Sequence, residues 1–89
     1  MIIDIKEFVG KIDPINMIKF LQYRGWREVP VKADYNRAFQ TLQDDKLYQI
    51  EVPISRDLSI FDTVMMMAVD TLAETMHMTA NEIIWTLLA

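Results

Sequence analysis

The sequence predicts a single α+β domain in which a three-stranded antiparallel sheet carries helices on one face, with the elements in the order ααβββαα. Three observations favour this class. The chain has 89 residues, enough for one hydrophobic core. Apolar residues recur at helical spacing near both ends and alternate with polar residues in the middle. No repeat or glycine-rich linker divides the sequence, so we expect one domain over residues 1–89.

A first helix is predicted from the spacing of Asp4 and Glu7, which matches a capping box at a helix start. Apolar residues then recur from Ile5 to Ile12 at the i, i+3, i+4, i+7 spacing of one helix face. The isoleucines at positions 2, 3 and 5 fit the start of a strand as well. Helix and strand therefore both stay open for residues 2–12.

A second helix is predicted near residues 14–24. Asp13 can cap its start, and Pro14 suits the first helical position. Gly25 follows where a left-handed residue ends a helix. The predicted buried face consists of Ile15, Ile18 and Leu21, with Met17 and Phe20 beside it.

The middle of the chain predicts three strands. Residues 26–31 contain aromatic and β-branched side chains together with Pro30, which indicates an edge strand or one that ends at the proline. Residues 37–43 and 47–54 flank the turn-like residues 44–46, which indicates an antiparallel hairpin. In its second arm we expect one buried and one exposed face: Tyr48, Ile50, Val52 and Ile54 alternate with Gln49, Glu51 and Pro53.

Two helix starts are predicted in the last third of the chain. Ser59 with Asp62 indicates the start of a helix that runs to about Met76. Thr79 with Glu82 forms a T-x-x-E capping box that opens a final helix running almost to the C-terminus.

The first of these helices is rich in methionine, because residues 64–78 contain five of the chain's seven methionines. The predicted buried stripe consists of Phe61, Val64, Met65, Ala68, Leu72 and Met76, widened by Met67, Val69 and Ala73. Core packing explains Met65 and Met67. Met66 falls on the side of Asp70, and a partner surface is an equally good interpretation of it, since methionine suits adaptable interfaces.

The final helix places Ile83, Ile84, Leu87 and Leu88 on one stripe, whereas Trp85 points away from its centre. Tryptophan is the residue most enriched in binding hot spots. We therefore expect a protein-interaction or regulatory module that self-associates through its C-terminal helices, as a homodimer, or binds a protein partner. The hypothesised interface consists of Met66, Met67, Asp70, Trp85 and Leu88.

Nucleic-acid binding is the alternative function, through a degenerate helix-turn-helix over residues 72–88. The final helix carries no lysine or arginine, and the whole net charge of -4 lies in residues 56–89, where one basic residue stands against five acidic ones. Such a segment repels phosphate backbones. The basic residues available elsewhere are Lys19, Arg24, Arg27, Lys32 and Arg37.

Catalytic, cofactor and metal sites find little support in the sequence. Two glycines exclude the glycine-rich phosphate-binding motifs, and one histidine without any cysteine leaves no local nucleophile motif. Met76, His77 and Met78 offer soft donors suited to copper(I), but no second histidine or methionine cluster completes a coordination shell. We expect no enzyme activity, no cofactor and no metal.

The absence of cysteine fits a reducing cytoplasm. The N-terminal residues lack the basic start and continuous apolar stretch of a secretory signal, and no apolar run approaches the roughly 18 residues of a membrane span. We therefore expect a soluble, cytoplasmic protein without a membrane partner.

The order of three short motifs carries a resemblance. GWREVP follows an amphipathic helix, a polar hairpin comes next, and D-L-S-x-F precedes the C-terminal helices. Over residues 15–89 this succession resembles a group of small uncharacterised bacterial proteins. The resemblance implies a compact stand-alone domain and no activity or functional residue.

Overall fold

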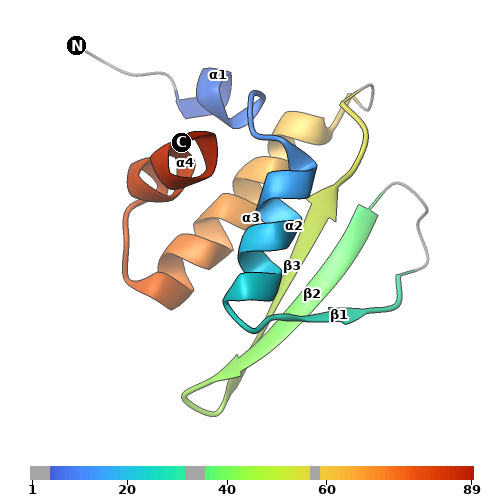
Figure 1. The fold of residues 1–89 in the computed structure, drawn as a ribbon, viewed down its shortest axis with the longest axis vertical. Helices are drawn as coiled ribbons and strands as arrows, with labels where there is room; N and C mark the ends of the chain where they lie inside the picture. The colour runs from blue at the N-terminus through green and yellow to red at the C-terminus, as the bar shows by residue number, and fades with distance from the viewer. Residues whose placement is uncertain (1–4, 32–35, 57–58) are drawn as a thin grey trace.

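The computed structural model describes residues 5–31, 36–56 and 59–89. These residues form α1 (Ile5–Val9), α2 (Pro14–Tyr23), β1 (Arg27–Val29), β2 (Asn36–Gln43), β3 (Lys46–Pro53), α3 (Phe61–Met76) and α4 (Ala80–Leu88). The strands form one antiparallel sheet in the order β1-β2-β3, and the helices gather on one side of it (Figure 1). The predicted α+β class and the order ααβββαα are confirmed.

The N-terminal segment, for which helix and strand were both open, is a helix from Ile5 to Val9. Its expected cap, Asp4, lies outside the described residues. α2 begins as predicted, because the Asp13 side chain accepts a hydrogen bond from the Ile15 N–H at 2.9 Å. The helix ends as predicted too. Gly25 has a φ of 87°, a left-handed conformation that glycine adopts without steric cost.

The sheet has one short edge strand and one tight hairpin. β1 stops before Pro30 and lies at the edge of the sheet, as predicted. Asp44 and Asp45 alone connect β2 to β3, and both have positive φ, 53° and 63°. These values belong to a mirror-image type I′ turn, whose twist matches that of the flanking strands. Lys46, predicted to lie in the turn, is instead the first residue of β3.

The two faces of the sheet differ in what covers them. Phe39 pairs with Ile50 across the hairpin, and both side chains are buried on the face that the helices cover. Since side chains alternate along a strand, Leu42 and its partner Leu47 lie on the opposite, outer face. Their exposed fractions are 70% and 61%.

The alternation predicted for β3 holds only up to Val52. Ile50 and Val52 are buried, and Gln49 is exposed between the hairpin turn and the core. Pro53 is fully buried, however, while Ile54 is 44% exposed, so these two positions reverse the prediction. β3 ends at Pro53, so the alternation does not extend to Ile54. Pro53 itself lies on the outer face with Asn36 and Ala38, and all three are buried, so this end of the outer face is covered.

The C-terminal helices begin differently from each other. Ile60 occupies the N-cap position of α3 and makes no side-chain cap hydrogen bond, so the predicted Ser59 cap is wrong by one residue. The predicted capping box of α4 is confirmed. The Thr79 hydroxyl accepts from the Glu82 N–H at 3.2 Å, and the Glu82 carboxylate accepts from the Thr79 N–H at 3.2 Å.

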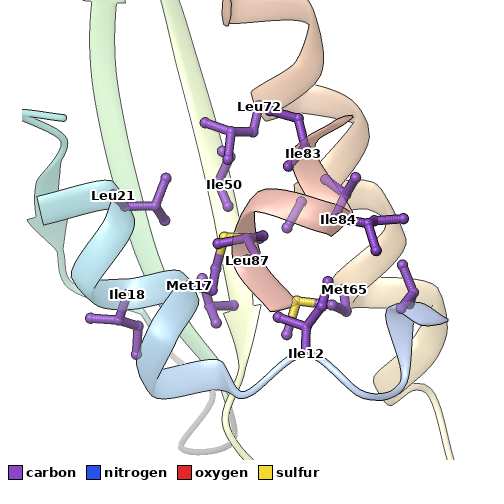
Figure 2. Close-up of a cluster of buried hydrophobic side chains, with 14 of the residues drawn as sticks. Ile12, Met17, Ile18, Leu21, Ile50, Met65, Leu72, Ile83, Ile84 and Leu87 are labelled. Atoms are coloured by element: carbon purple, nitrogen blue, oxygen red, sulfur yellow. The ribbon is translucent and has the colours of Figure 1, made fainter. Parts of the chain in front are cut away.

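The core lies where α2, α3 and α4 converge on β3 (Figure 2). Met17 of α2, Ile50 of β3 and Met65 of α3 are fully buried, and Ile83 of α4 is 1% exposed. Trp26 is 7% exposed and belongs to the same core. Burying one such side chain stabilises the fold by roughly 1.5–3 kcal/mol relative to exposing it.

Arg56 links the chain after β3 to the connection between α1 and α2. Its guanidinium donates hydrogen bonds to the carbonyl oxygens of Lys11 at 3.2 Å and Ile12 at 3.0 Å. Hydrogen bonds from a charged donor are stronger than neutral ones. They hold α1 near the start of α3, where a Cβ added to Gly10 would lie 2.9 Å from an Asp62 carboxylate oxygen.

Candidate interaction surfaces

Three consecutive methionines of α3 differ in exposure. Met65 is fully buried, Met66 is half-buried against the core, and Met67 is 64% exposed. Successive residues of a helix point about 100° apart, so the three sulfurs turn from the core to the surface. The prediction that Met67 packs in the core is therefore wrong. α3 has the core on one side only, and Met67 lies on the other side.

The remaining stripe of α3 follows the prediction closely. Phe61, Met65, Ala68, Val69, Leu72 and Ala73 are buried, while Val64 and Met76 are half-buried. Thr75 is buried as well, although a polar residue was not expected there. Its hydroxyl donates a hydrogen bond to the Leu72 carbonyl at 2.9 Å, which satisfies the group inside the core.

The α3 residues of the predicted interface lie together. Met66, Met67 and Asp70 line a shallow hollow, together with Asp62 and Thr63, and all five belong to α3. We call this hollow the methionine face. It combines flexible thioether side chains with two carboxylates at its rim, a composition that suits a protein surface able to adjust to its partner.

The α4 residues of the predicted interface lie elsewhere and do not line the methionine face. Trp85 is 53% exposed, and its ring packs against Phe8 of α1 with 5.4 Å between ring centroids and 45° between ring planes. Leu88 is half-buried against the core. The Trp85 indole therefore contacts α1 and remains about half exposed to solvent.

A second apolar surface lies on the outer face of the sheet, at the end next to the hairpin turn. The hollow there is lined by Gly25, Arg27, Gln40, Thr41, Leu42 and Leu47, and we call it the hairpin hollow. Figure 1 shows this end of the hairpin projecting beyond the helices. A Cβ added to Gly25 would meet no atom within 4 Å, so the space beside this glycine is open.

Sequence reasoning did not single out Leu42 and Leu47. A signal was present, because Leu47 is out of phase with Tyr48, Ile50 and Val52, which were assigned to the buried face. With a two-residue turn, the register then places Leu42 directly opposite Leu47. Two large apolar residues on the solvent-exposed face of the sheet indicate a contact surface.

Charged side chains on the sheet are paired at two places. Arg37 donates to Glu28 through Nε at 2.8 Å and forms an ion pair with it across β1 and β2. The hydrogen bond from Arg37 holds the pKa of the Glu28 carboxyl below its ordinary value. Lys46 lies 3.5 Å from Glu74 of α3, and the nearby Tyr48 and Glu74 raise the pKa of its ammonium group.

Two further charges stand on the outer face of the sheet. Arg27 pairs with Gln40 and Glu51 pairs with Ala38 in the strand register, so both side chains project on the same side as Leu42 and Leu47. Both are exposed, and neither forms an ion pair within residues 5–31, 36–56 and 59–89. Gln40 and Gln49 lie between them and share a side-chain hydrogen bond of 2.7 Å.

The helix-turn-helix predicted for residues 72–88 exists as a helical hairpin. His77 reverses the chain in a left-handed conformation with a φ of 54°. Met76 and Met78 beside it are half-buried against the core. Of the basic residues considered for nucleic acid, Arg37 is engaged by Glu28, and Lys32 lies outside the described residues. In the described ranges no group of three histidine, aspartate or glutamate side chains is arranged to hold a metal ion.

Comparisons of the chain with models of protein families, with curated proteins and with solved structures gave no match. The surfaces above are therefore interpreted from their own chemistry. None of the helices in the described part of the chain combines the length and apolar character required to cross a bilayer.

Proposed function

We propose that this chain is a non-catalytic protein-interaction module that self-associates through its C-terminal helices, with the methionine face of α3 as the principal contact. The observation that carries the proposal is the 64% exposure of Met67 in the middle of a 16-residue helix. When a partner covers Met67 and the neighbouring Met66, apolar surface is removed from water, which favours association.

Two further features support an interface formed by the C-terminal helices. The methionine face is bordered by Asp62 and Asp70, as protein interfaces have an apolar centre and a polar rim. Trp85 adds a half-exposed indole on α4, in contact with the Phe8 ring of α1. Tryptophan is the residue most enriched in binding hot spots.

Sedimentation equilibrium tests the proposal directly. We expect the wild type to associate reversibly between about 10 μM and 1 mM, the range expected of a modest interface. Met67→Glu places a charge at the centre of the contact, and we expect it to weaken association by about tenfold or more.

The matched control is Ile15→Glu on α2. Ile15 was expected on the buried face of this helix, but Met17 takes that place and Ile15 is 59% exposed, similar to Met67. The substitution should leave association unchanged. Equal association of the wild type and Met67→Glu at every concentration would count against the methionine face.

A further inference from the structure

We propose that the free edge of β3 binds an extended basic segment of another protein as an added strand, in a groove between β3 and α3. This occupant differs from the second copy of the chain proposed above, and its contacts begin at the backbone of β3. Met67 borders both the groove and the methionine face, so the bound segment and a second copy compete for this side chain.

The hairpin turn decides which backbone groups of β3 point to the free edge. Gln43 and Lys46 close a two-residue turn as a hydrogen-bonded pair, and such pairs alternate with non-hydrogen-bonded pairs along an antiparallel ladder. The N–H and C=O groups of Leu47, Gln49 and Glu51 therefore point away from β2. In the described part of the chain no backbone group pairs with them there. Such a row is a template for a further strand.

Pro53 marks the end of this template. It pairs with Asn36 at the next non-hydrogen-bonded position, so its nitrogen faces the same edge. Proline is tolerated in a strand where the missing N–H would point away from the ladder. The donors available to an added strand therefore end at Glu51.

α3 borders the free edge and turns it into a groove. Figure 1 shows α3 on the side of β3 away from β2, and the hollow between the two elements is lined by Gln49 and Glu51 together with Val64, Met67 and Thr71. Met67 is exposed, and Val64 and Thr71 are half-buried. Every second side chain of an added strand points to the same face of the sheet as α3. Apolar residues of the segment belong at these positions, against Val64 and Met67.

The position of α3 favours a separate segment over the β3 edge of a second copy. Two paired β3 strands are about 4.8 Å apart, whereas two packed helices need about 8–10 Å. Since each α3 lies on the free side of its own β3, pairing of the two edges forces both helices into the same space. An extended segment carries no helix at this place.

The charge of the groove selects a basic segment. Glu51 lines the groove, and Asp62 and Asp70 border the methionine face, which adjoins it at Met67. Among the residues that the structure describes, no lysine or arginine lines either hollow. Opposite charges across paired strands stabilise the pairing, and like charges oppose it. Main-chain hydrogen bonds then supply affinity, and the alternating side chains supply specificity.

The probe is a capped peptide of the sequence Thr-Lys-Val-Thr-Val-Lys-Thr, added to the isotopically labelled full chain and followed by amide nuclear magnetic resonance. The peptide reads the same in both directions, so a lysine meets Glu51 whichever way the strand runs. We expect the amide signals of Leu47, Gln49 and Glu51 to move on binding, because their N–H groups exchange water for a carbonyl acceptor.

Backbone methylation of the peptide tests strand addition without altering the protein. N-methyl groups on both valines block one side of the peptide strand, and N-methyl groups on both lysines and the central threonine block the other. One of these peptides should bind about tenfold more weakly, and the other should keep its affinity within about twofold. Equal affinities of the two would overturn the added strand.

Variants of the chain test the edge and the charge. Gln49→Pro removes an edge donor without touching the β2 ladder and should weaken peptide binding by about tenfold. The matched control is Leu42→Pro, whose N–H points away from β3 beyond the end of β1, and it should bind normally. Glu51→Lys should weaken binding by about two- to fivefold. Full binding by Gln49→Pro, with circular dichroism showing an intact fold, would overturn the use of the β3 backbone.

The outcomes separate this inference from the proposed function. Absence of peptide binding, with self-association still lost in Met67→Glu, would overturn the added strand and leave the methionine face standing. Peptide binding to a wild type that stays monomeric at millimolar concentration would support the added strand and overturn self-association. Movement of the Gln49 amide signal on raising the protein concentration alone would show that a second copy takes the edge, and would overturn the separate segment as its occupant.

Discussion

Met65 and Met67 allow the same substitution to be compared on opposite sides of one helix. Met65 is fully buried in α3, whereas Met67, two residues later, is 64% exposed. Replacing either residue by alanine removes the same atoms and gains the same helix propensity. Any difference between the two variants therefore reports packing rather than backbone preference.

The expected difference is large relative to the stability of the fold. Truncating a buried methionine to alanine costs roughly 2–5 kcal/mol, because apolar contacts are lost and a cavity is left. The exposed Met67→Ala change should stay within about 0.5 kcal/mol of the wild type. A domain of 89 residues has a free energy of unfolding of about 4–13 kcal/mol, so Met65→Ala removes a substantial fraction of it.

Urea unfolding followed by circular dichroism measures both effects, at a concentration low enough to keep the chain monomeric. With an m-value of roughly 1 kcal/mol/M, the midpoint of Met65→Ala should fall by about 2 M or more, while that of Met67→Ala should hardly move. Equal losses in the two variants would refute the assignment of a buried and an exposed side to α3.

Three further substitutions test particular contacts. Thr79→Ala removes the hydroxyl that accepts from Glu82 at the start of α4 and should cost about 1 kcal/mol in thermal or urea unfolding, with Thr79→Ser largely retaining the cap. Gly25→Ala forces a Cβ into a φ of 87° with free space around it, so backbone strain alone should destabilise the fold by about 1 kcal/mol; a stabilised variant would contradict the left-handed turn. Glu28→Gln should reduce stability near neutral pH, and its difference from the wild type should vanish on acidification: the folded carboxyl has a pKa below its ordinary value of 4.5, so its stabilisation is present above 4.5 and is lost as the pH falls through the folded value. A gap between Glu28→Gln and the wild type that widens in acid would show that Arg37 does not stabilise the ionised carboxylate.

Local patterns in the sequence predicted much of the fold because the physical cause was itself local. Asp13 before a proline and Gly25 after an apolar run act within one or two residues, and both ends of α2 came out as predicted. The Thr79 capping box depends on a contact of three residues. Each of these features depends on residues that lie close together in the sequence.

Predictions that depended on neighbouring elements were less secure. Leu47 is an example, since its partner across the hairpin is known only once the two-residue turn sets the register. Ile54 was misplaced because the end of a strand is not marked in the alternation before it. Pro53 was misplaced because the alternation does not show that this end of the outer face is covered. Met67 was misplaced for a different reason: at about 100° per residue it lies about 200° from Met65, so its spacing already indicated the exposed side of the helix.

The contacts that hold α1 and the α1–α2 connection in place have a consequence for how the chain folds. Most elements pack against the element next to them in the sequence: β1 on β2, β2 on β3, β3 on α3 and α3 on α4. Chains dominated by such near-neighbour contacts reach their native state quickly. The bonds from Arg56 to Lys11 and Ile12 and the contact of Phe8 with Trp85 close much longer loops. Residues 5–9 are synthesised well before α4, so the contact of Phe8 with Trp85 can form only after the last helix has left the ribosome.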